Sequence, residues 1–396
     1  MINMKNMIDL CEKHGFNNYS RFPVVWSSAD HGHMVDVDGN RYLDFMAGIA
    51  VNSLGYDDEG FKTALKDQID NIIHCSNLYY NLPQVKATEL LSAVSGYDKA
   101  FFCNSGTEAN EGALKLARIF GKKHKNGATK IIAFNNSFHG RSMGALSVTG
   151  QPKYQQDFTP LIPDILFADY NDINSVKKLI DDKVCALIME PIQGEGGIIT
   201  AEAEFVRELR TICTNEKIML IFDEVQTGIA RSGKMFVFEK LGVKPDVLTL
   251  AKGLGGGVPV GAICATEEFA KYFTPSTHGT TFGANPLATR AAEYVLSKVS
   301  TEEFLQSVEE KSEYIFTKLN GLKNKFSSIK SIRGMGLLIG VELIESVPTA
   351  EIVKKAFENK LLILSAGHNT LRFAPSLSVT KEQIDQALDI FEKIIK

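Results

Sequence analysis

"DVLTLAKGLGGGVPVGA", residues 246–262, holds a single lysine between an apolar run and three consecutive glycines. The run from Val247 to Ala251 predicts a short strand that is buried on both faces. Lys252 follows directly, and Gly255–Gly257 would let a bound molecule or another chain segment approach closely. Because ligands of open α/β sheets bind at the carboxyl ends of the strands, this stretch predicts a sheet with a lysine at its binding edge.

Other short apolar runs have the length and composition of strands covered on both faces. They lie at residues 130–134, 184–190, 218–222 and 261–265. Helix-like segments, notably 108–124 and 203–216, alternate with them. Alternation of this kind predicts an α/β fold whose large domain holds a mostly parallel sheet, with helices on both faces.

The pattern changes from about residue 285, and we expect a smaller α+β domain there. Its predicted elements are helices at 302–319, 350–359 and 380–395 and strand-like segments at 331–344, 361–367 and 370–377. An early segment, 33–48, predicts a hairpin that turns at Asp38-Gly39. We therefore expect an N-terminal segment (1–45) packed with the small domain, a large domain (46–285) and a small domain (286–396).

Composition excludes several classes of protein. A hydrophobic fraction of 44% and a charged fraction of 23% are ordinary for a soluble enzyme. A net charge of −4 offers no attraction to nucleic acid or to an anionic membrane. No run approaches the ~18 apolar residues of a membrane span, and the polar start does not resemble a signal peptide. The six scattered cysteines predict free thiols in the cytoplasm and no metal site.

Three predicted strands end in a charged residue: Glu190, Asp223 and Lys252. A site shared by the three ends explains this better than coincidence does. A desolvated lysine loses its proton readily and attacks carbonyl groups. Pyridoxal 5'-phosphate is the commonest aldehyde cofactor that needs such a lysine. It also requires a carboxylate for its ring nitrogen, a pocket for its phosphate and flat apolar support for its ring.

Each requirement has a candidate. Asp223 can pair with the ring nitrogen, although a strand-end aspartate can also cap a turn. Ser105 and Glu108 have capping-box spacing, and free N–H groups at such a helix start bind phosphate. Phe138 can support the ring, although an isolated aromatic belongs more often to the core. Arg141 can hold a carboxylate. We interpret the neighbouring histidine, His139, as structural.

Five motifs occur in the order seen in the subgroup III aminotransferases, the ω-aminotransferase branch of the fold type I pyridoxal-phosphate enzymes. They are FHGR (138–141), EPIQGEGG (190–197), FDEVQTG (222–228), LAKGLGGGVPVGA (250–262) and HGTTFGANPLA (278–288). The resemblance extends from Tyr19 to LRFAPSL (371–377). Segments 48–55 and 74–80 and the compact length are most similar to the acetylornithine-type members.

This resemblance implies roles for the cofactor residues. Lys252 matches the lysine that forms the Schiff base, and Asp223 matches the partner of the ring nitrogen. The other matches are Gly106 and Thr107 at the phosphate, Phe138 stacked on the ring, Val225 beneath the ring and Gln226 near its phenolic oxygen. In this family a threonine, here Thr281, reaches the phosphate held by the neighbouring subunit, and Thr280 lies close to substrate. A homodimer with shared sites is therefore expected.

The resemblance also implies how substrates are held. Arg372 matches the residue that binds the α-carboxylate of glutamate, and Arg141 the one that binds its distal carboxylate. Glu195 matches a residue that pairs with Arg372 while an ω-amine reacts, and Tyr19 matches a position near the substrate. Ala284 departs from the family pattern, in which we expect glycine.

The expected reaction moves the ω-amino group of N2-acetyl-L-ornithine to 2-oxoglutarate. The alternatives are ornithine, succinylornithine, succinyldiaminopimelate and 4-aminobutyrate transaminases, a glutamate-semialdehyde-type aminomutase, and a non-catalytic member of the fold.

Overall fold

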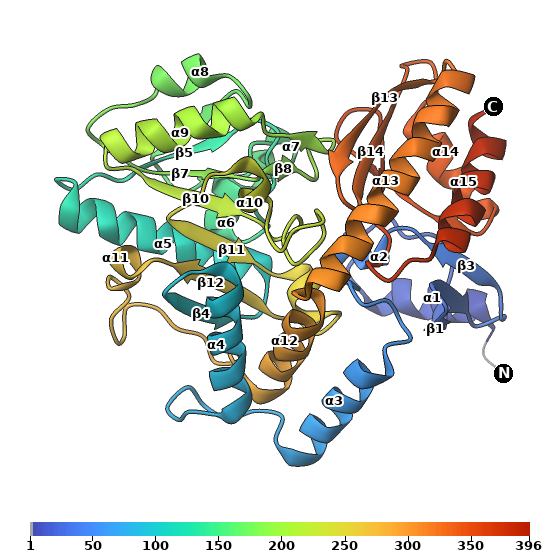
Figure 1. Cartoon of the computed structure of the whole chain (residues 1–396), viewed down its shortest axis with the longest axis horizontal. Coiled ribbons are helices and arrows are strands. Elements are labelled where there is room, and N and C mark those ends of the chain that lie inside the picture. The colour runs from blue at the N-terminus through green and yellow to red at the C-terminus, as the bar shows by residue number, and fades with distance from the viewer. Residues whose placement is uncertain (1–2) are drawn as a thin grey trace.

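The computed structural model describes residues 3–396 and contains a large sheet between layers of helices (Figure 1). Within these residues the sheet has seven strands in the order β4-β12-β11-β10-β7-β5-β6. Their bounds are β4 (Lys99–Cys103), β12 (Gly261–Ala265), β11 (Val247–Leu250), β10 (Met219–Asp223), β7 (Val184–Met189), β5 (Lys130–Phe134) and β6 (Ile165–Ala168). β12 is antiparallel to both of its neighbours, and the other pairs are parallel. The expected mostly parallel sheet is confirmed.

Both faces of this sheet are covered, which explains its continuous apolar strands. Ile221 of β10 packs in the cluster that contains α5 (Gly106–His124). Its neighbours Leu220 and Phe222 pack on the opposite face with α9 (Ala203–Asn215). Successive strand residues point to opposite faces, so an element buried on both must be apolar throughout.

The remaining elements of the large sheet's surroundings connect the strands or cover its edges. They are the turn α2 (Ala47–Ala50), α3 (Glu59–Asn71), α4 (Leu82–Ser95), α6 (Met143–Ser147), α7 (Pro152–Gln155), η1 (Gln156–Phe158), α8 (Ile173–Lys177), β8 (Ile192–Gln193), β9 (Ile199–Thr200), α10 (Val237–Leu241), η2 (Lys252–Gly255), α11 (Glu267–Ala270) and α12 (Pro286–Val299).

The C-terminal part forms an antiparallel sheet in the order β13-β14-β17-β16, packed with helices. Its elements are α13 (Glu302–Lys325), β13 (Ile329–Met335), β14 (Leu338–Leu343), α14 (Thr349–Glu358), β15 (Leu361–Leu362), β16 (Leu364–Ala366), β17 (Thr370–Phe373) and α15 (Lys381–Ile395). Segment 331–344, expected as one strand-like run, is a hairpin. Gly336 has a φ of +60°, a left-handed conformation that suits glycine and turns the chain.

The N-terminal part contains α1 (Met4–His14) and the strands β1 (Trp26–Asp30), β2 (His33–Asp36) and β3 (Arg41–Asp44). The predicted turn is present, and the Asp36 carboxylate accepts the backbone N–H groups of Asp38 and Asn40. Leu43 of β3 pairs in parallel with Leu361 of β15, so this hairpin lies beside the C-terminal elements. The domain boundaries at 45/46 and 285/286 stay a prediction, and residues 1–2 lie outside the described part.

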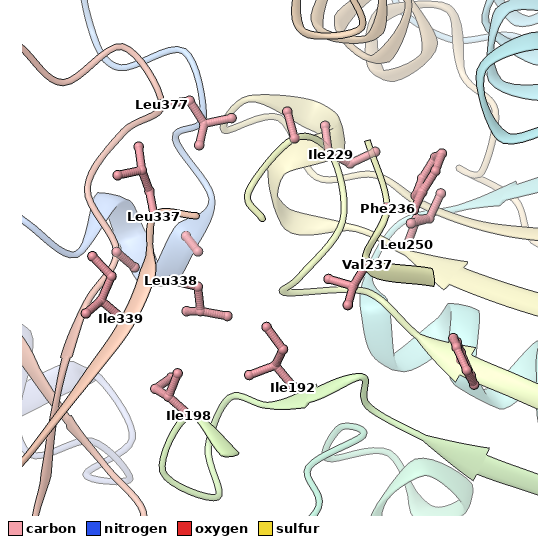
Figure 2. Packing of buried hydrophobic residues seen from close by; sticks show 14 of the residues in the cluster. Ile192, Ile198, Ile229, Phe236, Val237, Leu250, Leu337, Leu338, Ile339 and Leu377 are labelled. Atoms are coloured by element: carbon pink, nitrogen blue, oxygen red, sulfur yellow. The ribbon is translucent and has the colours of Figure 1, made fainter. Parts of the chain in front are cut away.

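A buried apolar cluster joins the two halves of the molecule beside the binding edge of the large sheet. Figure 2 shows Ile192 and Ile198 of the β8–β9 segment facing Leu338 and Ile339 at the start of β14. The chain between Ile192 and Ile198 contains Glu195. The cluster therefore holds the loop of Glu195 against the sheet that carries Arg372.

No helix within residues 3–396 is long and apolar enough to cross a membrane.

Candidate active site

The three charged strand ends meet at one cavity of about 420 Å³. Glu190 follows β7, Asp223 ends β10 and Lys252 follows β11, and these three strands are neighbours in the sheet. Most of the predicted site residues line the same cavity: Gly106, Thr107, Phe138, Arg141, Glu190, Glu195, Asp223, Val225, Gln226 and Lys252. The side-by-side carboxyl ends of parallel strands produce this convergence.

Lys252 lines the cavity two residues after the end of β11. Its φ of +45° is unusual for a residue with a side chain. Burial and, to a smaller extent, the positive charge of Arg372 lower the pKa of Lys252 to about 8, although the charges of Glu195 and Asp223 oppose this shift. The amine therefore has a substantial uncharged fraction near neutral pH, as a nucleophile and proton acceptor needs.

Asp223 is only 4% exposed and accepts three hydrogen bonds. Asn110 Nδ2 donates to Asp223 Oδ2 at 2.7 Å, and His139 Nδ1 lies 2.8 Å from the same oxygen. The backbone N–H of Val225 donates to Oδ1 at 3.0 Å. Sequence reasoning missed Asn110 and interpreted His139 as structural. The position of Asn110 one helical turn after Gly106, in a helix expected to start at the site, was a usable signal.

Glu190 is a second buried carboxylate in the cavity. Its oxygens accept the backbone N–H groups of Phe138 at 2.9 Å and Gly194 at 3.1 Å. Burial raises the pKa of Glu190 well above its usual value, and the neighbouring charge of Asp223 raises it further. Glu190 thus supports the two segments that carry Phe138 and Glu195.

The predicted anion pocket is the start of α5. Ser105 Oγ accepts the N–H of Glu108 at 3.3 Å, as a capping box requires. The reciprocal bond is different from the expectation, because the Glu108 carboxylate accepts from the backbone N of Asn104 at 2.7 Å instead. The N–H groups of Gly106 and Thr107 are at the first turn of the helix, where the helix dipole favours a phosphate.

Gly106 also shows that this wall is closely fitted. A Cβ atom at Gly106 would lie 2.7 Å from Cγ1 of Val225, well inside van der Waals contact. Only glycine lets the phosphate end of the cavity and the Val225 wall approach this closely. The donor set as a whole, with a helix N-terminus, a buried carboxylate and an amine, suits pyridoxal 5'-phosphate.

Arg372 on β17 forms a closed ion pair with Glu195. Nη1 of Arg372 lies 2.5 Å from Glu195 Oε1 and 3.1 Å from the side-chain oxygen of Gln226. Burial raises the pKa of Glu195, but the charge and hydrogen bond of Arg372 outweigh this and leave it below its usual value. Nε of Arg372 is buried without a hydrogen-bond partner within residues 3–396.

Arg141 lines the cavity and is itself exposed to solvent, so it lies where the cavity meets the surface. Its guanidinium lies 3.8 Å from the ring centre of Tyr154 and 5.6 Å from that of Phe138. Stacking on aromatic rings orients a guanidinium while its N–H groups stay free for a carboxylate. Sequence reasoning did not identify Tyr154.

Four predicted residues do not line the cavity in the single chain: Arg372, which reaches it through its bond to Glu195, and Tyr19, Thr280 and Thr281. Tyr19 is 66% exposed, and Thr281 is exposed as well. Thr280 Oγ1 accepts a 3.1 Å hydrogen bond from Asn104, which does line the cavity. Their roles stay predictions. Ala284, the departure from the family pattern, has a φ of +61°, a conformation that favours the expected glycine.

The comparison with known families agrees with this geometry. The model of the family described as "Aminotransferase class-III" matches residues 16–395, almost the full length of the chain. The chain belongs to the class-III aminotransferases. The resemblance found in the five motifs is thus confirmed, and so are the fold type and the pyridoxal 5'-phosphate dependence that go with the family.

Individual class-III aminotransferases are similar over nearly all of their length. The acetylornithine aminotransferase of Clostridium acetobutylicum is 48% identical over 382 residues, which covers 96% of this chain and 98% of the relative. The ornithine aminotransferase of Toxoplasma gondii has a TM-score of 0.94 at 30% identity, covering 100% and 94% of the two chains. The acetylornithine aminotransferase of Elizabethkingia anophelis has a TM-score of 0.88 at 30% identity, covering 100% and 99%.

Proposed function

We propose that the chain transfers the ω-amino group of N2-acetyl-L-ornithine to 2-oxoglutarate, giving N-acetyl-L-glutamate 5-semialdehyde and L-glutamate, a step of arginine biosynthesis. The observation that carries the proposal is one cavity lined by a lysine of lowered pKa, by a buried carboxylate and by Glu195, which is paired with Arg372. The 48% identity to an acetylornithine aminotransferase supports the substrate.

The cavity fits the family's cofactor residue by residue. Lys252 would hold the aldehyde carbon, Asp223 the ring nitrogen, and the start of α5 at Gly106 and Thr107 the phosphate. Phe138 and Val225 would enclose the ring, with Gln226 near its phenolic oxygen. When bound, pyridoxal 5'-phosphate supplies an electron sink for the carbon that carries the amino group.

Lys252 then acts as the proton carrier. Its Nζ would remove a proton from the carbon that carries the substrate's amino group and would give that proton to the carbon of the cofactor's former aldehyde group. A positioned side-chain base of this kind accelerates proton transfer by ~10²–10⁴-fold. The pKa of about 8 suits both directions, since the amine accepts and releases a proton near neutral pH.

The arginines select the two substrates. Arg141 at the open end would bind the carboxylate far from the reacting amine, which acetylornithine and glutamate both have. Arg372 would bind the α-carboxylate of glutamate, which acetylornithine lacks at that place. The closed Arg372–Glu195 pair suits the acetylornithine half-reaction, because Glu195 then neutralises a buried arginine that has no substrate carboxylate.

The charges of the cavity favour an acylated α-amino group over the free one of ornithine. The carboxylates that this chain contributes to the lining, within residues 3–396, are Glu190, Glu195 and Asp223. Each already binds protein donors: two backbone N–H groups, Arg372, and the Asn110–His139 pair respectively. A free α-ammonium beside Arg141 would meet a cation without a counter-ion, whereas an amide is neutral.

A substrate panel tests the proposal. The loaded enzyme is mixed, without 2-oxoglutarate, with acetylornithine, ornithine, succinyldiaminopimelate or 4-aminobutyrate, and the half-reaction is followed by its absorbance change. Acetylornithine is expected to react fastest at low concentration. A higher kcat/KM for ornithine or 4-aminobutyrate would replace acetylornithine as the substrate, and no spectral change with any amine would contradict transamination.

We also propose that the active unit is a homodimer with shared sites and that it works in the cytoplasm. The loop of Thr281 is surrounded by exposed apolar side chains, which an isolated chain rarely leaves in one area. Phe282 is 63% exposed beside Thr281 and lies near His74, and the nearby segment adds Leu78, Tyr79 and Tyr80. Such a surface fits a second copy that receives Thr281 at its phosphate pocket.

Mixed dimers test the shared site. Lys252→Ala and Thr281→Ala chains are each expected to be poorly active. When they are co-expressed, a mixed dimer regains one of its two sites with both residues, so the activity of purified mixed dimers should approach about one half of wild type. The measurement is specific activity after tandem-tag purification of each mixture. No recovery in mixed dimers would place Thr281 in the site of its own chain.

A further inference from the structure

His139 is a buried side chain that has no role in the proposed reaction as described so far. It is 2% exposed and lines the cavity from the segment after β5. Its Nδ1 lies 2.8 Å from Oδ2 of Asp223, across 84 residues of sequence. Because a carboxylate oxygen accepts, Nδ1 is the donor of this bond. The histidine is therefore bonded to the residue that would hold the ring nitrogen.

The backbone around His139 fixes the direction of this bond. Its N–H donates to Thr149 Oγ1 at 2.9 Å, and its carbonyl accepts from Asn110 Nδ2 at 2.7 Å. The other ring nitrogen, Nε2, is buried with no hydrogen-bond partner within residues 3–396. A donor at Nδ1 is satisfied by Asp223, whereas a donor at Nε2 would be left without an acceptor.

A second arm of hydrogen bonds, from Thr249 through Asn110, reaches the same oxygen, Oδ2 of Asp223. Thr249 on β11 donates from Oγ1 to Oδ1 of Asn110 at 2.7 Å, which turns the amide so that Nδ2 points at Asp223. All of these side chains are buried. The carboxylate is thus positioned from a strand, a helix and a loop together.

Hydrogen-bond donors take the place of water around the buried carboxylate of Asp223. A buried carboxylate stays ionised only where hydrogen-bond donors replace water. Glu190 lies in the same cavity, and burial together with the negative charge of Asp223 raises the pKa of Glu190. Side-chain donors reach Asp223, whereas Glu190 has two backbone N–H groups. The two carboxylates therefore differ in the donors that hold them, and those of Asp223 include side chains that a substitution can remove.

We propose that His139 is a positioning residue that holds the carboxylate of Asp223 directed at the ring nitrogen of the cofactor, with Asn110 and Thr249 as the second arm. The proposal rests on the proposed function, since it takes Asp223 as the partner of that nitrogen. It acts through Asp223 alone and leaves the phosphate and aldehyde contacts unchanged.

Binding to the apoenzyme provides a test that does not depend on activity. Two probes are titrated by calorimetry: pyridoxal 5'-phosphate and its 1-deaza analogue, in which CH replaces the ring nitrogen. Wild type is expected to prefer pyridoxal 5'-phosphate. His139→Leu should reduce that preference by about 10- to 100-fold, the usual effect of losing a hydrogen bond to a charge, with little change for the analogue. His139→Gln keeps a donor and should restore much of the preference.

The Asp223→Asn variant distinguishes an error in the role of His139 from an error in the proposed function. It should abolish the preference; an intact preference would contradict the pairing of Asp223 with the ring nitrogen and hence the proposed function. If Asp223→Asn abolishes the preference but His139→Leu leaves it unchanged, or weakens both probes equally, the role of His139 is wrong. Should His139→Leu fail to fold, Thr249→Val serves instead, and an unchanged preference there overturns the proposal.

Discussion

Lys252→Ala is expected to reduce turnover of acetylornithine by more than about 10⁴-fold, because it removes both the covalent anchor of the cofactor and the base that moves the proton. The lowered pKa of Lys252 and its position in the cavity beside Asp223 are the structural basis. Steady-state assays with 2-oxoglutarate measure the loss. Dialysis should also remove the cofactor absorbance above 400 nm from this variant.

Lys234→Ala is the matched control, since Lys234 is an exposed lysine outside the cavity lining. It should keep both normal rates and the absorbance band. Normal turnover by Lys252→Ala would contradict the assignment of Lys252 and, with it, the whole account of the site.

Glu195→Gln is expected to change the balance of the two half-reactions rather than stop both. Glutamine cannot neutralise the buried Arg372, so the acetylornithine half-reaction loses its counter-ion. The glutamate half-reaction brings a carboxylate to Arg372 and no longer has to displace a charged partner. We expect the ratio of the two single-turnover rates to shift by about 10- to 100-fold toward glutamate.

Asp246→Asn is the control for the loss of an arginine–carboxylate pair. Asp246 pairs with Arg210 at 2.9 Å at the opposite end of β11 from Lys252, so the ratio of half-reactions should be unchanged. Equal slowing of both half-reactions in Glu195→Gln would show that Glu195 is not a switch between substrates.

Much of the site could be predicted because it depends on local pattern. The apolar strands have their expected positions: 130–134 and 261–265 coincide with β5 and β12. Glu190, Asp223 and Lys252 converge because parallel neighbours place their carboxyl ends at one edge. The start of the helix at Ser105 could also be predicted, whereas the hydrogen-bond partner of the Glu108 side chain could not.

The chain's pattern of residues thus determined the kind of sheet, the edge at which chemistry occurs and the family. Only the tertiary structure decided which polar groups are bonded to one another there. His139 meets Asp223 across 84 residues, Asn110 meets it across 113, and Arg372 meets Glu195 across 177. The physical reason is that periodicity reflects burial of each segment against its neighbours, whereas a hydrogen bond between distant segments depends on how complete layers pack.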